Sequence, residues 1–306
     1  MYADGEEILA IRRAAREAGV MVSLGLSERG RGSVGRVWNS NLLIGRDGGV
    51  LALHRKLVPT FFEKMVWGNG DAGGLRVVED STGRDGLDDG GVRARVGVLV
   101  CGENTNPLAR FALMAQGETV HISSWPAVWP TRALGGEGVG KGQGRNYDNI
   151  AANRMRAAAH CFEAKCFGVM SSGVLDEEAI RICSEGADEP ESVRRTLEAS
   201  PRGASLFLDP TGALLPGFTI DEEGNRKDVE FLQHEEGILY ADMNLEDCIE
   251  GKQYHDVVGG YQRYDVFDLK VRRERKDPVT FIDDFGPEKG GEEDLLFKDS
   301  DDPLAR

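Results

Sequence analysis

An apolar run that leads directly into a cysteine constrains the possible fold of this chain more than any other feature. Residues 96–100 (Val-Gly-Val-Leu-Val) have the composition of a buried strand, Cys101 follows at once, and Pro107 begins a helix-forming segment. A strand followed closely by a helix is typical of layered α/β proteins. The order therefore predicts a thiol at the end of a strand, where a small molecule can reach it.

The same alternation of strands and helices continues along most of the chain. Strands are predicted at 20–26, 92–100, 120–123, 167–171, 204–208 and 237–241, and a pair of strands within 37–53 joined by a turn at 46–49. Helices are predicted at 8–18, 107–116 and 152–166. This order predicts an α/β fold with mixed sheets, which forms a single domain over residues 1–275.

Three segments differ from this pattern in their composition. Residues 76–91 are charged and rich in Gly and Asp, which predicts a surface hairpin or insertion. Residues 131–145 are glycine-rich and predict a mobile loop. Residues 276–306 are acidic and poor in apolar side chains, which predicts a flexible C-terminal tail.

Charge and cysteine content exclude several classes of function. The 306 residues carry a net charge of −15, which argues against a nucleic-acid partner. No apolar run approaches the length of a membrane span, and the N-terminus shows no signal pattern, so a cytoplasmic protein is predicted. The five cysteines are scattered without a CxxC pair, which argues against a disulfide framework or a zinc site.

A second stretch rich in charged residues lies at 54–60 (His-Arg-Lys-Leu-Val-Pro-Thr). Lys56 stands where a predicted strand gives way to a loop, and Glu63 follows seven residues later. A lysine in a cleft can stabilise developing negative charge. Taken alone, Lys56 and Glu63 are better explained as an ordinary ion pair on the surface.

Three motifs occur together and in a characteristic order. They are residues 54–60 with Glu63 and Trp67-Gly68, residues 101–104 with 107–110, and residues 252–261 with 265–267. With these motifs the chain resembles the nitrilase branch of the carbon–nitrogen hydrolase superfamily over roughly residues 5 to 270. The resemblance implies a four-layer α-β-β-α sandwich. It also implies a homo-oligomer, either a dimer or a longer spiral.

The resemblance also implies roles for individual residues. Cys101 is the expected nucleophile, Lys56 the group that stabilises the tetrahedral intermediate, and Glu63 a second, positioning glutamate. Glu103 is expected to act from within the cysteine motif, with a structural role or, like Asn104, in contact with substrate. Gly102 stands where the family commonly has tryptophan, which predicts an altered pocket shape.

One expected residue has no match in the chain. The family's general-base glutamate lies in a Phe-Pro-Glu-like context before the first predicted helix, and Glu6 and Glu7 follow that position. The sequence therefore predicts that the first strand, the first helix and the general base are missing. An incomplete gene model and a degenerate paralogue both remain open as explanations.

A further group of aromatic residues follows the predicted strand at 120–123. Trp125, Pro126 and Trp129 are expected to form the wall and lid of a substrate pocket, and the alternative is a plain aromatic and proline-rich loop. The reaction that the resemblance implies is thiol-dependent hydrolysis of a small nitrile to a carboxylic acid and ammonia. No metal or organic cofactor is expected. The alternatives are a non-catalytic assembly subunit and an amide hydrolase with the same site.

Overall fold

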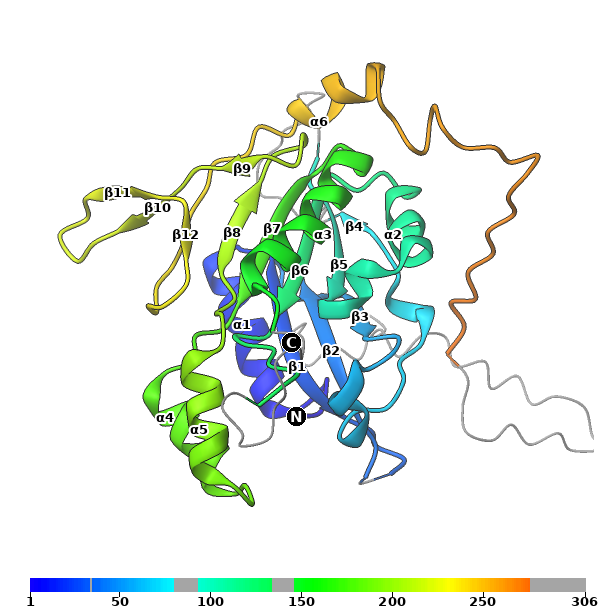
Figure 1. Ribbon diagram of the computed structural model, residues 1–306. Coiled ribbons are helices and arrows are strands. Elements are labelled where there is room, and N and C mark those ends of the chain that lie inside the picture. Colours follow the sequence, from blue (N-terminus) through cyan, green and yellow to red (C-terminus); the bar gives the residue numbers. More distant parts are fainter. Residues whose placement is uncertain (34, 80–92, 134–145, 276–306) are drawn as a thin grey trace, which may run out of the picture. The chain divides into compact units, whose positions relative to one another are not determined.

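The computed structural model describes residues 1–33, 35–79, 93–133 and 146–275, and these form two compact units. The first unit comprises residues 1–118 together with the segment that begins at Arg263, and the second comprises residues 119–262 (Figure 1). Most of the predicted surface hairpin, most of the glycine-rich loop and the whole acidic tail lie outside the described residues. No helix in the described ranges is long and apolar enough to cross a membrane.

The first unit begins with a helix packed on a three-stranded antiparallel sheet of order β1-β2-β3. The elements are α1 (Glu6–Ala18), β1 (Val22–Arg29), β2 (Val37–Ile44) and β3 (Val50–Arg55). Gly19 ends α1 with a φ of 65°, and Gly48 makes the predicted turn between β2 and β3 with a φ of 82°. Ile8 and Leu42 are fully buried where the helix meets the sheet, so the predicted helix and strand pair are confirmed.

The second part of this unit contains the predicted strand and helix on either side of Cys101. Its elements are β4 (Val78–Glu79), β5 (Arg95–Val100), the 3-10 helix η3 (Cys101–Thr105) and α2 (Pro107–Met114). β4 and β5 are antiparallel. Asn106 caps α2, because its side chain accepts hydrogen bonds from the backbone N–H groups of Leu108 and Ala109. Two more 3-10 helices follow β3, namely η1 (Phe61–Met65) and η2 (Ala72–Gly74).

The second unit is built on two parallel strands joined by a helix. β6 (Val120–Trp125) and β7 (Phe167–Ser172) are parallel, and α3 (Asn149–Ala164) connects them. β8 (Ser205–Leu208) is antiparallel to β7 and pairs with β9 (Leu214–Leu215) and β12 (Phe231–Leu232). The remaining elements are the hairpin β10 (Gly217–Ile220) and β11 (Arg226–Val229), α6 (Asp247–Glu250) and η4 (Gly251–Gln253).

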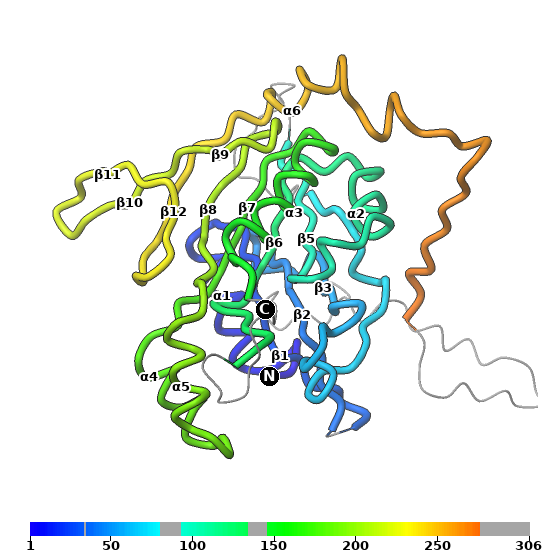
Figure 2. Tube along the Cα trace, in the orientation of Figure 1, coloured from blue at the N-terminus to red at the C-terminus, as the bar shows by residue number. Residues whose placement is uncertain are grey.

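The second unit also departs from the prediction in two places. The chain between β7 and β8 contains two helices that were not predicted, α4 (Glu177–Glu185) and α5 (Pro190–Ala199). The two helices pack against each other (Figure 2). The strand predicted at 237–241 is wrong, since only Tyr240 forms an isolated bridge, to Phe218. A short apolar run becomes a strand only where a partner strand accepts its hydrogen bonds, and that requirement cannot be read from the run itself.

Candidate active site

Cys101 lies at a sharp bend directly after β5. It is the first residue of η3, it is buried, and its φ of 54° places it in the left-handed region that non-glycine residues rarely adopt. The side-chain amide of Asn104 supports the bend by donating to the carbonyl oxygens of Leu99 (3.2 Å) and Cys101 (3.0 Å). Such strained positions persist only when the surroundings hold them, and they are concentrated at functional sites. The structure thus confirms the predicted cysteine at the end of a strand. The Asn104 amide holds the bend at this position.

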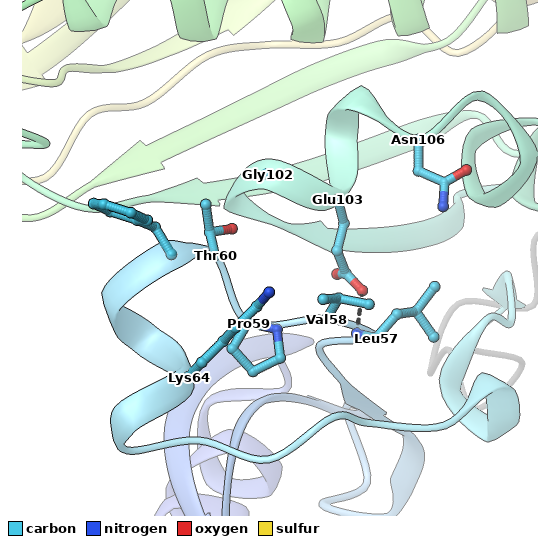
Figure 3. Close-up of a pocket in the computed structure, with 9 residues that line it drawn as sticks. Leu57, Val58, Pro59, Thr60, Lys64, Gly102, Glu103 and Asn106 are labelled. Carbon is cyan, nitrogen blue, oxygen red and sulfur yellow. Dashed lines mark hydrogen bonds between the residues drawn. The ribbon is translucent and has the colours of Figure 1, made fainter. Parts of the chain in front are cut away.

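Glu103 connects this bend to the lysine motif. One carboxylate oxygen accepts hydrogen bonds from His54 Nε2 (2.9 Å) and from the backbone N–H of Val100 (2.9 Å). The other oxygen accepts from the backbone N–H of Leu57 (2.5 Å) (Figure 3). Since Leu57 directly follows Lys56, these bonds hold the lysine and cysteine motifs together. These bonds support the structural role expected for Glu103, and its contact with substrate stays a prediction.

The ionisation of Glu103 is controlled by these partners. Burial alone would raise the pKa of this carboxyl group, since a charge is poorly solvated in the interior. The facing His54 and the backbone N–H groups of Leu57 and Val100 act in the opposite direction and lower the pKa below its ordinary value. The carboxylate is therefore the stable form in the folded protein at neutral pH.

Lys56 and Glu63 form the second part of the site. Lys56 directly follows β3, its side chain is fully buried, and its ammonium group donates to Glu63 Oε2. The same oxygen accepts from the backbone N–H of Thr60 (2.5 Å), and the backbone N–H of Glu63 donates to the Thr60 carbonyl oxygen (3.0 Å). These bonds fix the glutamate at the start of η1. The pair is therefore buried and positioned, unlike an ordinary ion pair on the surface.

Gly102 allows the two motifs to approach closely. A Cβ atom at this position would lie 2.7 Å from the Thr60 hydroxyl oxygen, which is closer than real side chains allow. Either Thr60 or the η3 backbone would have to move to accept any larger residue. The glycine noted in the sequence thus allows Thr60 to lie against η3 as it does here.

A pocket of about 340 Å³ opens beside this contact. Figure 3 shows its walls, which come from the loop after β3, from η1 and from η3. The lining residues are Leu57, Val58, Pro59, Thr60, Phe61, Lys64, Gly102, Glu103 and Asn106. Cys101, Lys56 and Glu63 lie next to lining residues in the chain and do not themselves line the pocket.

Two of these lining residues were not anticipated from the sequence. Phe61 has a φ of 50° and is 59% exposed, and Lys64 is also exposed. The available signal was the Phe61-Phe62-Glu63-Lys64 order, in which two aromatic side chains directly precede two charged ones, one of them a catalytic candidate. Sequence reasoning treated the segment only as the surroundings of Glu63.

The predicted aromatic wall lies in the second unit. Trp125 ends β6 and is buried, with its indole N–H donating to Ser123 Oγ (3.2 Å) and the Arg156 guanidinium over its ring at 5.3 Å. The Pro126 carbonyl accepts from Ser172 Oγ (3.2 Å), and Trp129 is half-buried in the loop that follows. These contacts give an ordered turn after β6. Contact of these three residues with substrate stays a prediction.

Comparison with known proteins identifies one family. Residues 2–253 match the model of the carbon–nitrogen hydrolase family. A nitrilase of Penicillium rubens is 30% identical over 94% of this chain and 75% of its own length. A bromoxynil-specific nitrilase of Klebsiella pneumoniae subsp. ozaenae is 33% identical over 95% and 70%. A cyanide hydratase of Gibberella zeae is 31% identical over 94% and 71%.

Solved structures share the fold at lower sequence identity. A carbon–nitrogen hydrolase of Helicobacter pylori G27 aligns with a TM-score of 0.54 and 19% identity over 81% of this chain and 70% of its own. The NitFhit protein of C. elegans aligns with a TM-score of 0.55 and 16% identity over 90% of this chain and 54% of its own. These likenesses confirm the predicted α/β sandwich fold.

Proposed function

This chain belongs to the carbon–nitrogen hydrolase family, in its nitrilase branch, and we propose that it hydrolyses a nitrile to a carboxylic acid and ammonia. The observation that carries the proposal is the arrangement of Lys56, Glu63 and Cys101. The lysine and glutamate form a buried pair, and Glu103 holds their segment against the bend that carries the cysteine. In nitrile hydrolysis through a thioester, a thiol supplies the nucleophile and a fixed ammonium group stabilises the charged intermediates.

The proposed hydrolysis passes through two covalent intermediates on Cys101, a thioimidate and a thioester. The Cys101 thiolate adds to the nitrile carbon, and protonation of the nitrogen gives a thioimidate. Water adds to that carbon, and collapse of the tetrahedral intermediate breaks the C–N bond and releases ammonia, which leaves a thioester. A second water molecule adds, the C–S bond breaks, and the carboxylic acid leaves with the thiol regenerated. No external oxidant or reductant is consumed.

Lys56 supplies positive charge at the reacting centre. In each tetrahedral intermediate, negative charge develops on an atom bound to the former nitrile carbon, and a fixed ammonium group stabilises it without reorganisation. The hydrogen bond to Glu63 holds this ammonium in place and keeps its charge balanced in the interior. Glu63 is thus a positioning residue for Lys56.

The direct test is ammonia release from simple nitriles such as benzonitrile. The wild-type protein and the Cys183→Ser variant, which changes an exposed cysteine, are expected to be equally active, whereas Cys101→Ser is expected to be inactive. The Lys56→Met variant is expected to lose about a hundredfold or more in kcat, the scale of a lost transition-state donor. Ammonia release that exceeds the protein-free background and is equal in wild type and Cys101→Ser would refute the proposal.

The same assay examines the predicted lack of a general base. Loss of a general base lowers rates by roughly two to four orders of magnitude. Activity of the 306-residue chain is therefore compared with that of the chain preceded by the in-frame coding segment upstream. A large increase that depends on a glutamate in that segment would support the prediction, and equal, high activity would contradict it.

The same experiment measures the product. One relative is a cyanide hydratase, and a tetrahedral intermediate that expels the thiolate instead of ammonia yields an amide. Chromatography of the products gives the ratio of acid to amide. Predominant amide would replace the proposed hydrolysis by hydration at the same cysteine.

A further inference from the structure

We propose that the pocket beside Cys101 selects aromatic nitriles that carry an anionic oxygen substituent such as a carboxylate. Lys64 would bind the anion and Phe61 would contact the ring. This proposal rests on the proposed function and names the substrate class of the same site. It is carried by an ammonium group and an aromatic ring that line one pocket and have no other evident use in the fold.

The first observation is the position of the Lys64 ammonium group. Figure 3 shows it pointing into the pocket from η1. Within the described part of the chain it forms no hydrogen bond or ion pair, although the neighbouring Glu63 carboxylate is within the same helix turn. That carboxylate is already bound to Lys56. Lys64 therefore lines the pocket as a cation, and the acidic residue next to it in the sequence is already bound to Lys56.

The second observation concerns the negative charge in the pocket wall. Glu103 is the only acidic residue among the lining residues, and its two oxygens accept from His54, Leu57 and Val100. These donors offset its charge, and the group is almost completely buried. An anionic substituent near Lys64 would consequently be attracted by the ammonium group. The Glu103 carboxylate would repel it little, because hydrogen-bond donors already offset its charge.

The third observation is the strained and exposed Phe61. Its φ of 50° is uncommon for a bulky residue, and its ring remains 59% exposed beside Phe62, with ring centroids 4.0 Å apart. The Thr60 backbone N–H donates to the Glu63 carboxylate (2.5 Å), and the Glu63 backbone N–H donates to the Thr60 carbonyl oxygen (3.0 Å), so the turn around Phe61 is held in place. An aromatic side chain held in a strained conformation without being buried is expected where it contacts a ligand.

The shape of the pocket agrees with a substituted aromatic ring. Its volume of about 340 Å³ falls in the range of roughly 300–1,000 Å³ typical of small-molecule sites. Leu57, Val58 and Pro59 add apolar surface for the faces of a ring. Gly102, the residue after the nucleophile, and Lys64 lie on separate walls, which come from η3 and η1. A ring with the nitrile toward Gly102, which directly follows Cys101 in the chain, and the anion toward Lys64 would span the pocket from η3 to η1.

The test compares two isosteric substrates, 4-cyanobenzoate and the neutral 4-nitrobenzonitrile. The ratio of their kcat/KM values removes effects common to both substrates. We expect Lys64→Gln to lower this ratio about three- to tenfold and Lys64→Glu to lower it further, while the exposed control Lys227→Gln leaves it unchanged. The wild-type preference should weaken as salt is added. An unchanged ratio in both Lys64 variants would overturn the proposal.

A binding measurement separates this proposal from the proposed chemistry. The Cys101→Ser protein is titrated calorimetrically with 4-cyanobenzoate and 4-nitrobenzonitrile, so no turnover is needed. Tighter binding of the anion, lost in Lys64→Gln, supports the site even if no nitrile is hydrolysed. Phe61→Leu should weaken both ligands alike, since it removes the aromatic surface and leaves the charge. Binding of 4-cyanobenzoate that is equally tight with and without the Lys64 charge refutes the site, whatever the enzyme activity.

Discussion

The Glu103→Ala substitution examines the link on which the active-site geometry depends. In the folded protein the carboxylate accepts three hydrogen bonds, from His54 Nε2 at 2.9 Å and from the backbone N–H groups of Leu57 at 2.5 Å and Val100 at 2.9 Å. Each buried donor left unpaired costs about 1–3 kcal/mol. With about 1 kcal/mol for each of the three donors, we expect a loss of about 3 kcal/mol in the free energy of unfolding.

Two measurements check this expectation at different resolution. Equilibrium unfolding in guanidinium chloride reports the free energy of unfolding, in which a loss of about 3 kcal/mol is roughly a hundredfold change in the unfolding equilibrium constant. Hydrogen exchange followed by mass spectrometry reports on the peptide that contains Leu57. The N–H group of this residue donates to Glu103, so its exchange should accelerate in the variant even under native conditions.

The pH dependence provides an independent check on the same residue. Because its partners hold the pKa of Glu103 below the ordinary 4.5, the carboxylate contributes stability that is fully present above that value. This contribution is lost as the pH falls through the lower pKa of the folded state. The variant should therefore lose less stability than the wild type between about pH 5 and pH 3.

The control for these measurements is Glu178→Ala. Glu178 is an exposed residue whose carboxylate pairs with Arg181 on the surface of α4. This substitution should leave the unfolding midpoint and the exchange of the Leu57 peptide unchanged. If Glu103→Ala behaves in the same way as this control, the argument that Glu103 connects the two motifs is wrong.

Three further predictions follow from the same structure. Gly102→Ala should lower both stability and activity, because its Cβ would lie 2.7 Å from the Thr60 hydroxyl oxygen. Adding Thr60→Ala should restore part of the lost unfolding midpoint, and no recovery would contradict the proposed contact. Phe61→Gly relieves about 1 kcal/mol of backbone strain, but the glycine costs about 0.5–1 kcal/mol in chain entropy, so the free energy of unfolding should change little. A loss of the ~3–5 kcal/mol typical of a buried phenylalanine would contradict the exposed position. Iodoacetamide at pH 8 should label the exposed Cys183 and spare Cys248, since burial raises the pKa of the Cys248 thiol to about 11. Peptide mass spectrometry measures the labelling of each cysteine, and equal labelling would refute the prediction.

The sequence by itself determined the features that depend on nearby residues. The position of Cys101 after a strand and before a helix follows from an apolar run and from the proline at position 107, and the structure confirms it with β5, η3 and α2. The position of Lys56 at the end of β3 follows in the same way from the turn at 46–49 and the run before it. Such patterns express hydrophobic periodicity and turn chemistry, which act over a few residues.

The partner of each charged group was decided by the tertiary structure. Glu63 is next to Lys64 in the sequence, yet its carboxylate binds the buried Lys56 seven residues earlier. The Lys64 ammonium is left in the pocket. Glu103 bonds to Leu57 across 46 positions of the chain. Burial sets the cost of leaving a charge unpaired, and burial depends on which distant segments pack together. The motifs therefore specify which groups are present, and the packing of the loop after β3 against η3 specifies how they are arranged.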